Sequence, residues 1–173
     1  MQSKILIVVD MQNDFIDGIL GTKEAQKIVQ PVVEYIQNYR GQILITQDIH
    51  NKLEYSNSTE SKYCPIHCLK GTAGACINLK AEDALPISNI YQKHTYGCTN
   101  MAQDITYRPD NTVIEIVGLC TDICVISNAL LIRAFNPNKR IIVHADMCAG
   151  TTPEKHKEAL DVMKSCGIEV VGE

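Results

Sequence analysis

The sequence predicts an α/β fold, namely a three-layer, doubly wound and mainly parallel sheet with helices on both faces. Short runs of apolar, mostly β-branched residues recur along the chain, as expected for strands buried on both faces. Segments with apolar residues at helical spacing lie between most of these runs, and such alternation is typical of a parallel sheet covered by helices. With 173 residues and no internal repeat or linker, the chain is expected to form a single domain over residues 1–173.

Six apolar runs are predicted to be strands. The first follows a short polar N-terminus and ends at Asp10, so it indicates a strand and not a signal peptide. The third is weaker than the others. In chain order the predicted strands are Ile5–Val9, Ile43–Thr46, Ile87–Tyr91, Val113–Val117, Ile141–Ala145 and Ile168–Val171.

Three helices are predicted between the strands. Lys23–Tyr39 carries apolar residues at helical spacing, and a glycine soon follows as a stop signal. A second helix with an apolar face runs from Cys124 to Phe135. In the third, Thr152 is expected to cap the helix and Pro153 to occupy its first position. Proline is tolerated there because the backbone N–H that it lacks would have no hydrogen-bond partner within the helix.

Titratable or nucleophilic side chains follow four of the predicted strands where those strands end. The carboxyl ends of parallel strands meet at one edge of a sheet, and ligands of such sheets bind beyond that edge. We therefore expect these side chains to form one site. They are Asp10 after the first strand, Asp48 and His50 after the second, Lys93 after the third, and Cys120 and Cys124 after the fourth.

Cys124, Asp10 and Lys93 have the chemistry of a nucleophile, a base and a cation. A cysteine in the first turn of a helix is close to free amides and to the positive end of the helix dipole, which stabilise a thiolate and can hold an oxyanion. Asp10 could accept the thiol proton, and Lys93 would keep Asp10 ionised or lower the pKa of the thiol. Singly, each has a plainer interpretation: a buried cysteine, a turn residue and a surface lysine.

Three motifs in this order resemble the cysteine hydrolases of the isochorismatase-like superfamily, and within it the nicotinamidases (pyrazinamidases). The motifs are Val9–Phe15, Lys93–Gly97 and Gly118–Val125. The resemblance implies a single cysteine hydrolase domain in which Asp10 is the base and Cys124 the nucleophile, assisted by Lys93. It also implies a cis peptide bond before Cys120, with the backbone amides of Cys120 and Cys124 as the oxyanion hole.

A metal site is predicted beside this set. Asp48 and His50 lie two residues apart, on one side of an extended segment. His67 comes from the long irregular region between residues 50 and 87, and a loop of that length inside a compact domain usually has a function. The resemblance implies one divalent ion held by these three residues, with zinc preferred and manganese or iron possible. A rival interpretation, a zinc knuckle of Cys64, His67 and Cys68, lacks the second ligand pair of such sites.

The fourth protein ligand has three candidates, because no histidine lies between His50 and His67. They are Glu60, Glu54 and Ser56. Glu60 precedes His67 by seven residues, a spacing that resembles the branch of the family that uses a glutamate. We therefore expect Glu60.

The resemblance also implies the residues of a substrate pocket. Phe15 and Tyr96 stand where the family places rings that stack on the substrate. The position that usually carries a further aromatic residue is Cys64 in this chain, and the adjacent Tyr63 is a possible substitute.

Composition excludes several other classes of function. The formal net charge of −4 argues against a surface for nucleic acid or anionic membranes, and the apolar runs are too short to span a bilayer. The eight cysteines show no redox CxxC spacing and are expected to be reduced thiols, which places the chain in the cytoplasm. The sequence is compatible with a homo-oligomer.

The expected activity is hydrolysis of nicotinamide to nicotinate and ammonia through a Cys124 thioester, in NAD salvage. One alternative is an isochorismatase-like cysteine hydrolase that acts on another small amide. Another is a non-catalytic metal-binding or ligand-binding protein that keeps the fold, since a fold alone does not decide function.

Overall fold

The computed structural model describes residues 3–79 and 90–173, and this part of the chain contains one six-stranded sheet. The strand order is β3-β2-β1-β4-β5-β6, and every neighbouring pair is parallel, which confirms the predicted fold class. The strands are β1 Lys4–Val9, β2 Gln42–Asp48, β3 Ile90–Lys93, β4 Val113–Leu119, β5 Arg140–Ala149 and β6 Glu169–Val171.

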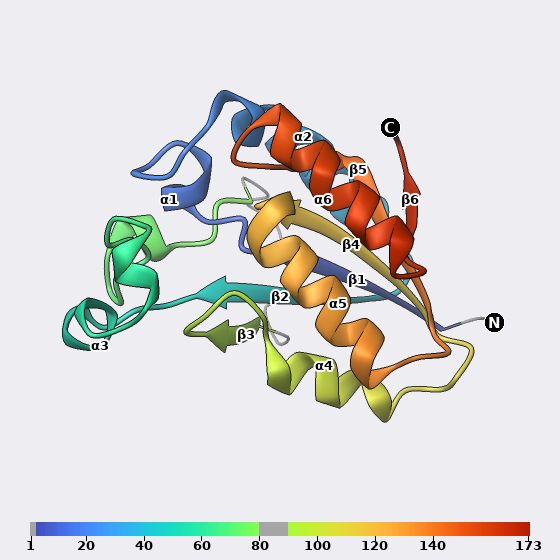
Figure 1. The fold of residues 1–173 in the computed structure, drawn as a ribbon. Helices are drawn as coiled ribbons and strands as arrows, with labels where there is room; N and C mark the ends of the chain where they lie inside the picture. Colours follow the sequence, from blue (N-terminus) through green and yellow to red (C-terminus); the bar gives the residue numbers. More distant parts are fainter. Residues whose placement is uncertain (1–2, 80–89) are drawn as a thin grey trace.

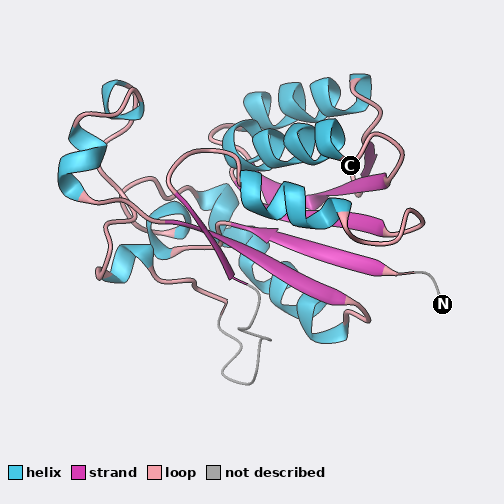
Figure 2. Cartoon of the chain, turned by 90° about the horizontal axis from the view of Figure 1, so that it is seen from below, coloured by secondary structure: helices cyan, strands magenta, loops and turns pink. Residues whose placement is uncertain are grey.

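Helices cover both faces of the sheet (Figures 1 and 2). The short helix α1 (Asn13–Ile16) and the long helix α2 (Lys23–Asn38) pack on one face. The opposite face is covered by α4 (Thr99–Thr106), α5 (Ile126–Phe135) and α6 (Pro153–Ser165).

The central strand β1 shows why the sheet needs both helical layers. Ile5, Ile7 and Val9 belong to the core beneath α4, α5 and α6, whereas Leu6 and Val8 belong to the core beneath α2. Successive side chains of a strand point to opposite faces, so an uninterrupted apolar run must be covered on both sides. Each such isoleucine or leucine stabilises the fold by about 1.5–3 kcal/mol when it is fully buried.

The strand order also fixes where a site can form. From β1 the chain builds the sheet outward through β2 and β3, and it then returns to the other side of β1 with β4. Loops that follow β1 and β4 therefore leave in opposite directions and open a crevice at the carboxyl ends of these strands. Asp10 follows β1, and Cys124 follows β4.

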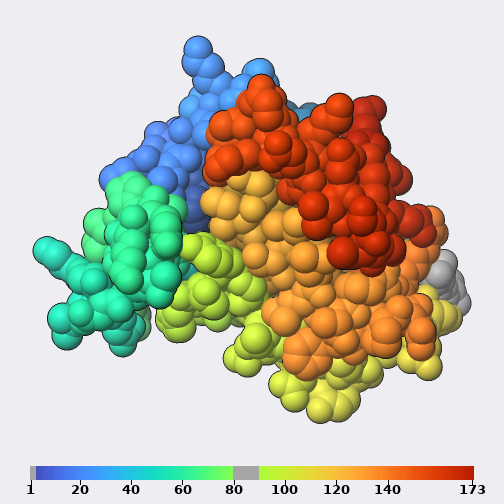
Figure 3. Space-filling model, viewed as in Figure 1, coloured from blue at the N-terminus to red at the C-terminus, as the bar shows by residue number. Residues whose placement is uncertain are grey.

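The region beyond this edge contains short helical elements that were expected to be irregular. They are α3 (Lys52–Ser56) and the 3₁₀ turns η1 (Glu60–Lys62) and η2 (Ala73–Ala75). The π-helical turn η4 (Thr121–Val125) lies at the same edge, directly before α5. In Figure 1 the arrowheads of β2 and β4 point towards them, and in Figure 3 the segment around α3 projects from the body of the molecule.

Several predicted boundaries differ from the structure. The helix expected to begin at Cys124 begins at Thr121 as η4, and β5 continues past the predicted end at Ala145. Residues 87–89 of the weak third strand lie outside the described residues, and β3 begins at Ile90. The helix α4 was not predicted, because its apolar residues are too few to show a period.

No helix in residues 3–79 or 90–173 is both long and apolar enough to cross a membrane. All eight cysteines lie in the described part of the chain and are free thiols.

Candidate active site

Asp10 is held in place by Thr46 of the neighbouring strand. Its backbone N–H donates to the Thr46 carbonyl at 3.3 Å, and the Thr46 hydroxyl donates to Asp10 Oδ1 at 2.7 Å. Asp10 has φ 46°, a left-handed conformation that aspartate tolerates better than most residues. The chain turns away from β2 there, and the carboxylate is left fully buried at the edge of the sheet.

The ammonium group of Lys93 connects the predicted catalytic residues. Lys93 ends β3, and its Nζ lies 2.8 Å from Asp10 Oδ2, 3.5 Å from Cys124 Sγ and 3.5 Å from Asp48 Oδ1. Its fourth partner is the Thr95 carbonyl at 3.0 Å. Burial alone would lower the pKa of Lys93, but the negative charges around it raise the pKa well above 10.5, so Lys93 stays charged.

Cys124 is a buried thiol in η4, the turn that joins β4 to α5. The peptide bond between Leu119 and Cys120 is cis, as the resemblance implied. We expected helix amides and Lys93 to stabilise a thiolate, but burial raises the pKa of Cys124 well above 9.0 against the opposing effect of Lys93. The resting residue is therefore a neutral thiol, whose proton must leave when the sulfur attacks.

The turn that carries Cys124 is tied to the start of α6. The Thr151 amide and hydroxyl donate to the two carboxylate oxygens of Asp122 at 2.8 and 2.6 Å. The Thr121 hydroxyl lies 2.8 Å from His156 Nδ1. These contacts brace the turn, and sequence reasoning did not identify them because each joins residues about thirty positions apart.

A glycine allows this turn to begin close to β1. Gly118 has φ +119°, and a Cβ atom there would lie 2.2 Å from the Val9 carbonyl oxygen. Any other residue would clash with the backbone of β1, so the nucleophile turn and Asp10 could not come together as they do.

Asp48, His50, Glu60 and His67 bring four possible metal ligands together. One ligand atom from each lies within 4.8 Å of the other three. His50 Nε2 is 2.9 Å from Asp48 Oδ2, and His67 Nε2 is 3.3 Å from the same oxygen and 3.6 Å from Glu60 Oε1. Among the candidates for the fourth position, Glu60 therefore lies with the set, whereas Glu54 lies on α3 and pairs with Asn51.

The donor set fits a divalent ion. His67 Nδ1 lies 2.9 Å from the Pro65 carbonyl, which can only accept, so Nδ1 carries the proton and Nε2 is free to bind a metal. Burial and the charge of Asp48 raise the pKa of Glu60, which reflects two carboxylates held close together. A divalent cation would remove that repulsion, and two imidazoles with two carboxylates suit zinc, manganese or iron.

The rival zinc knuckle is not formed. His67 directs Nε2 towards Asp48 and Glu60, while the Cys68 thiol is buried beside the Gln12 side-chain amide at 3.4 Å. Burial is also the main reason why the pKa of Cys68 is raised, so this thiol is unsuited to metal binding.

A narrow cavity of ≈ 20 Å³ separates the nucleophile from the metal-ligand set. The predicted pocket residues Phe15, Tyr96 and Cys64 all line it, together with two apolar residues that were not predicted, Leu20 and Ile123. The volume holds about one water molecule, so an aromatic ligand requires the side chains of the wall to move apart.

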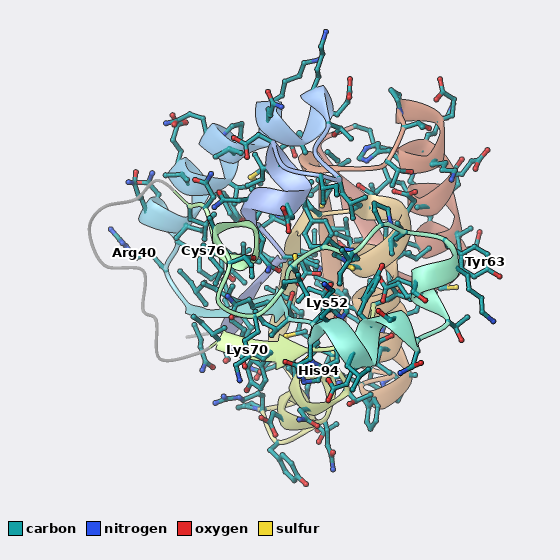
Figure 4. The ribbon with its side chains drawn as sticks, turned by 90° about the vertical axis from the view of Figure 1, so that its left-hand side faces the viewer. Arg40, Lys52, Tyr63, Lys70, Cys76 and His94 are labelled. Atoms are coloured by element: carbon teal, nitrogen blue, oxygen red, sulfur yellow. The ribbon has the colours of Figure 1, made fainter. Side chains whose placement is uncertain are left out.

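Tyr63 does not substitute for an aromatic residue at position 64. Its side chain is 78% exposed and points away from the molecule (Figure 4). A larger cavity of ≈ 310 Å³ lies between α2, β5 and α6, but none of the predicted catalytic or metal-binding residues lines it.

Comparisons with known proteins bear on the family and the fold of the chain. The family model described as the isochorismatase domain matches residues 4–172. A solved structure of a Pyrococcus horikoshii pyrazinamidase in complex with zinc superposes with a TM-score of 0.83 at 30% identity, covering 99% of each chain.

Two curated relatives extend the comparison. The isochorismatase family protein PncA of Bacillus subtilis is 28% identical over 96% of this chain and 98% of its own length. A nicotinamidase of Schizosaccharomyces pombe is 27% identical over 97% of this chain and 92% of its own length.

Proposed function

We propose that this chain, which belongs to the isochorismatase family, is a metal-dependent nicotinamidase that forms nicotinate and ammonia through a Cys124 thioester, in NAD salvage. The observation that carries the proposal is the position of the Lys93 ammonium, within 3.5 Å of Asp10, Asp48 and Cys124. The proposed nucleophile, its proposed base and a proposed metal ligand thus surround one cation. The nicotinamidase and pyrazinamidase relatives support the choice of substrate.

The first half of the reaction transfers the acyl group to sulfur. Asp10 accepts the thiol proton as Cys124 Sγ attacks the amide carbon. The backbone amides of Cys120 and Cys124 hold the oxyanion that forms. When the C–N bond breaks, Asp10 returns the proton to the leaving nitrogen and ammonia departs.

The second half releases the acid. Asp10 takes a proton from water, the resulting hydroxide attacks the thioester carbon, and the C–S bond breaks to give nicotinic acid, which releases its proton to solvent as nicotinate. The thiolate regains the proton from Asp10. Lys93 remains protonated throughout, because its pKa lies well above 10.5, and its charge balances whichever of Asp10 and Cys124 is ionised.

Asp48, His50, Glu60 and His67 would hold the metal ion. Bound there, the ion would supply a Lewis acid for the pyridine nitrogen and so would help to orient the substrate ring. Phe15, whose ring centroid lies 5.3 Å from that of His67, and Tyr96 are placed to pack against the substrate ring.

A comparison of two substrates tests the proposal. Ammonia release from nicotinamide and from benzamide, which lacks the ring nitrogen, should be measured before chelation, after treatment with a pyridine-type chelator, and after addition of zinc, manganese or iron. Nicotinamide should be turned over far faster than benzamide, and this activity should disappear on chelation and return with metal. Equal rates for both amides on metal-loaded protein would contradict the orienting role.

Cys64 favours one alternative, a hydrolase of another small amide. A thiol at this part of the wall leaves more room beside the substrate than an aromatic ring would. A screen of small amides would support the alternative if one of them gave a higher kcat/KM than nicotinamide on the metal-loaded protein.

A further inference from the structure

We infer that Gln12 is a positioning residue for the metal site, because its side-chain amide replaces a strand as the hydrogen-bonding partner of the Asp48 backbone. The inference rests on the metal site of the proposed function and is independent of the substrate.

The need for such a partner follows from the path of β1. The strands β1 and β2 pair in register up to Val9 and Thr46, and the last backbone bond of the pair is from Asp10 N–H to the Thr46 carbonyl. The left-handed conformation of Asp10 then takes the chain away from β2. Asp48 lies two residues beyond Thr46, so its N–H and C=O point to the same side. They have no backbone of β1 to face.

Gln12 supplies both missing hydrogen bonds. The Asp48 N–H donates to Gln12 Oε1 at 2.7 Å, and Gln12 Nε2 donates to the Asp48 carbonyl at 2.8 Å. The amide thus copies the donor and acceptor of a strand residue. Its second N–H donates to the Ala75 carbonyl at 2.9 Å. Gln12 is fully buried, so its donors have no water to turn to.

The consequence concerns the carboxylate of Asp48. With backbone bonds to Gln12 on one side and the pairing with Lys93 of β3 on the other, the main chain at Asp48 is held from both sides. One carboxylate oxygen then stays with the two histidines and the other stays near Lys93. A group that fixes a metal ligand in this way typically contributes a factor of about 10–100 to metal affinity.

A competing explanation is that Gln12 only anchors the loop that contains Ala75. Gln47 provides a matched control, since its Nε2 donates to the same Ala75 carbonyl at 3.0 Å without bonding to Asp48. Gln47 is also adjacent to Asp48 in the chain and of the same residue type. Loss of the loop anchor can therefore be separated from loss of the Asp48 partner.

The test is the zinc affinity of Gln12→Met and Gln47→Met, measured without substrate by competition with a chromogenic chelator, well below the melting temperature of each apoprotein. We expect Gln12→Met to lose about 10–100-fold in affinity and Gln47→Met to stay close to the wild type. If Gln12→Met does not fold, Gln12→Asn, which keeps an amide that is too short to reach both backbone groups, replaces it with the same expectation.

Wild-type zinc affinity in the Gln12 variant would overturn the inference, as would an equal loss in Gln47→Met. A lower melting temperature with unchanged affinity would show a structural role only. Wild-type protein that binds zinc but releases no ammonia from nicotinamide would contradict the proposed function and leave the role of Gln12 intact, whereas protein that binds no zinc would overturn both.

Discussion

Two buried carboxylates of the same sheet behave in opposite ways. Asp10 lies at the carboxyl edge, where the proposed catalytic groups meet, whereas Glu115 lies near the other end of β4, opposite Leu6 of β1. Both are shielded from solvent, and both have a lysine nearby. Yet the pKa of Asp10 is raised and that of Glu115 is lowered.

Within the described residues, the partners of Glu115 bond to no other carboxylate. Tyr35 donates to one of its oxygens and Tyr39 to the other, His144 Nε2 lies at 2.9 Å, and Lys4 is 3.8 Å away. Burial alone would raise the pKa of Glu115, but these hydrogen bonds and charges lower it. The residue is therefore suited to permanent ionisation, and it ties α2 to β4 and β5.

Asp10 shares its main partner. Thr46 occupies one oxygen, but the Lys93 ammonium at the other also contacts Asp48 and Cys124. Burial raises the pKa of Asp10, Lys93 opposes this, and the charge of Asp48 adds to it. The difference teaches that the number of dedicated donors, more than burial, decides whether a carboxylate stays charged or can take up and return a proton.

The largest expected effect comes from replacing Cys124, whose thiol carries the proton that Asp10 is proposed to accept. Cys124→Ala should fold normally and lose roughly 10⁴-fold or more in ammonia release, since no nucleophile remains. Mass spectrometry of quenched reactions should detect an acyl adduct on the wild type and none on the variant. The control is Cys120→Ala, which keeps the proposed backbone amide and should have a mild effect. Substantial turnover by Cys124→Ala would refute the thioester.

Asp10→Asn tests the proposed role of Asp10 as the base that takes up and returns the proton. The change keeps the shape and removes the acceptor, so kcat should fall on the order of a hundredfold or more. Because the pKa of Asp10 is raised, the wild-type rate should decline with falling pH at a midpoint above 3.8, and the variant should lack this acidic limb. An unchanged pH profile would assign the base to another group.

Glu60 extends the comparison to a carboxylate that, among residues 3–79 and 90–173, has no hydrogen-bond donor of its own. Its pKa is raised by burial and by Asp48, so a bound cation should stabilise its charged form. Glu60→Ala should lower metal affinity by about 10-fold or more, whereas Glu54→Ala, on the exposed side of α3, should not. Metal content per protein after dialysis decides between them, and the reverse result would move the fourth ligand to Glu54.

Glu115→Gln should have the smallest effect on catalysis and a clear effect on stability. Activity should remain within about twofold, because the residue lies far from the nucleophile. The free energy of unfolding at neutral pH should fall by about 1–3 kcal/mol, the usual cost of disturbing a buried charged hydrogen-bond network.

The pH dependence of that loss gives a second check. The pKa of Glu115 is lowered in the folded state, so its stabilising effect is complete above the unfolded value of 4.5 and is lost as the pH falls through the folded pKa. Urea unfolding at neutral and at acidic pH should therefore show the gap between variant and wild type closing in acid. A gap that widens in acid would contradict the assigned direction.

The fold could be predicted because its signals are local, and the same signals, together with the resemblance to a family, indicated the residues of the candidate site. Apolar runs mark the strands, and Asp10, Asp48, Lys93 and Cys124 stand where such runs end. Strand β5 was cut short in the prediction because Asp146 interrupts its apolar pattern, although the strand continues to Ala149.

The supporting residues could not be predicted, because their function depends on partners that are distant in the chain. Glu115 stands inside an apolar run whose only local meaning is a buried strand, and its partners come from α2 and β5. Gln12 and Thr46 likewise gain their roles only when β1 and β2 lie side by side. The balance between burial and Lys93 at Cys124 also required the assembled structure.

The position of β1 at the centre of the sheet has a consequence for synthesis of the chain. Lys4 pairs with Val113, so β1 receives its second neighbour only once synthesis has passed β4. Until then a nascent chain can pair β1 with β2 and β2 with β3, but the other edge of β1 stays unpaired. An unpaired edge of an apolar strand is the kind of surface that aggregates or recruits chaperones. The candidate site is therefore completed late, because Asp10 follows β1 whereas Cys124 follows β4.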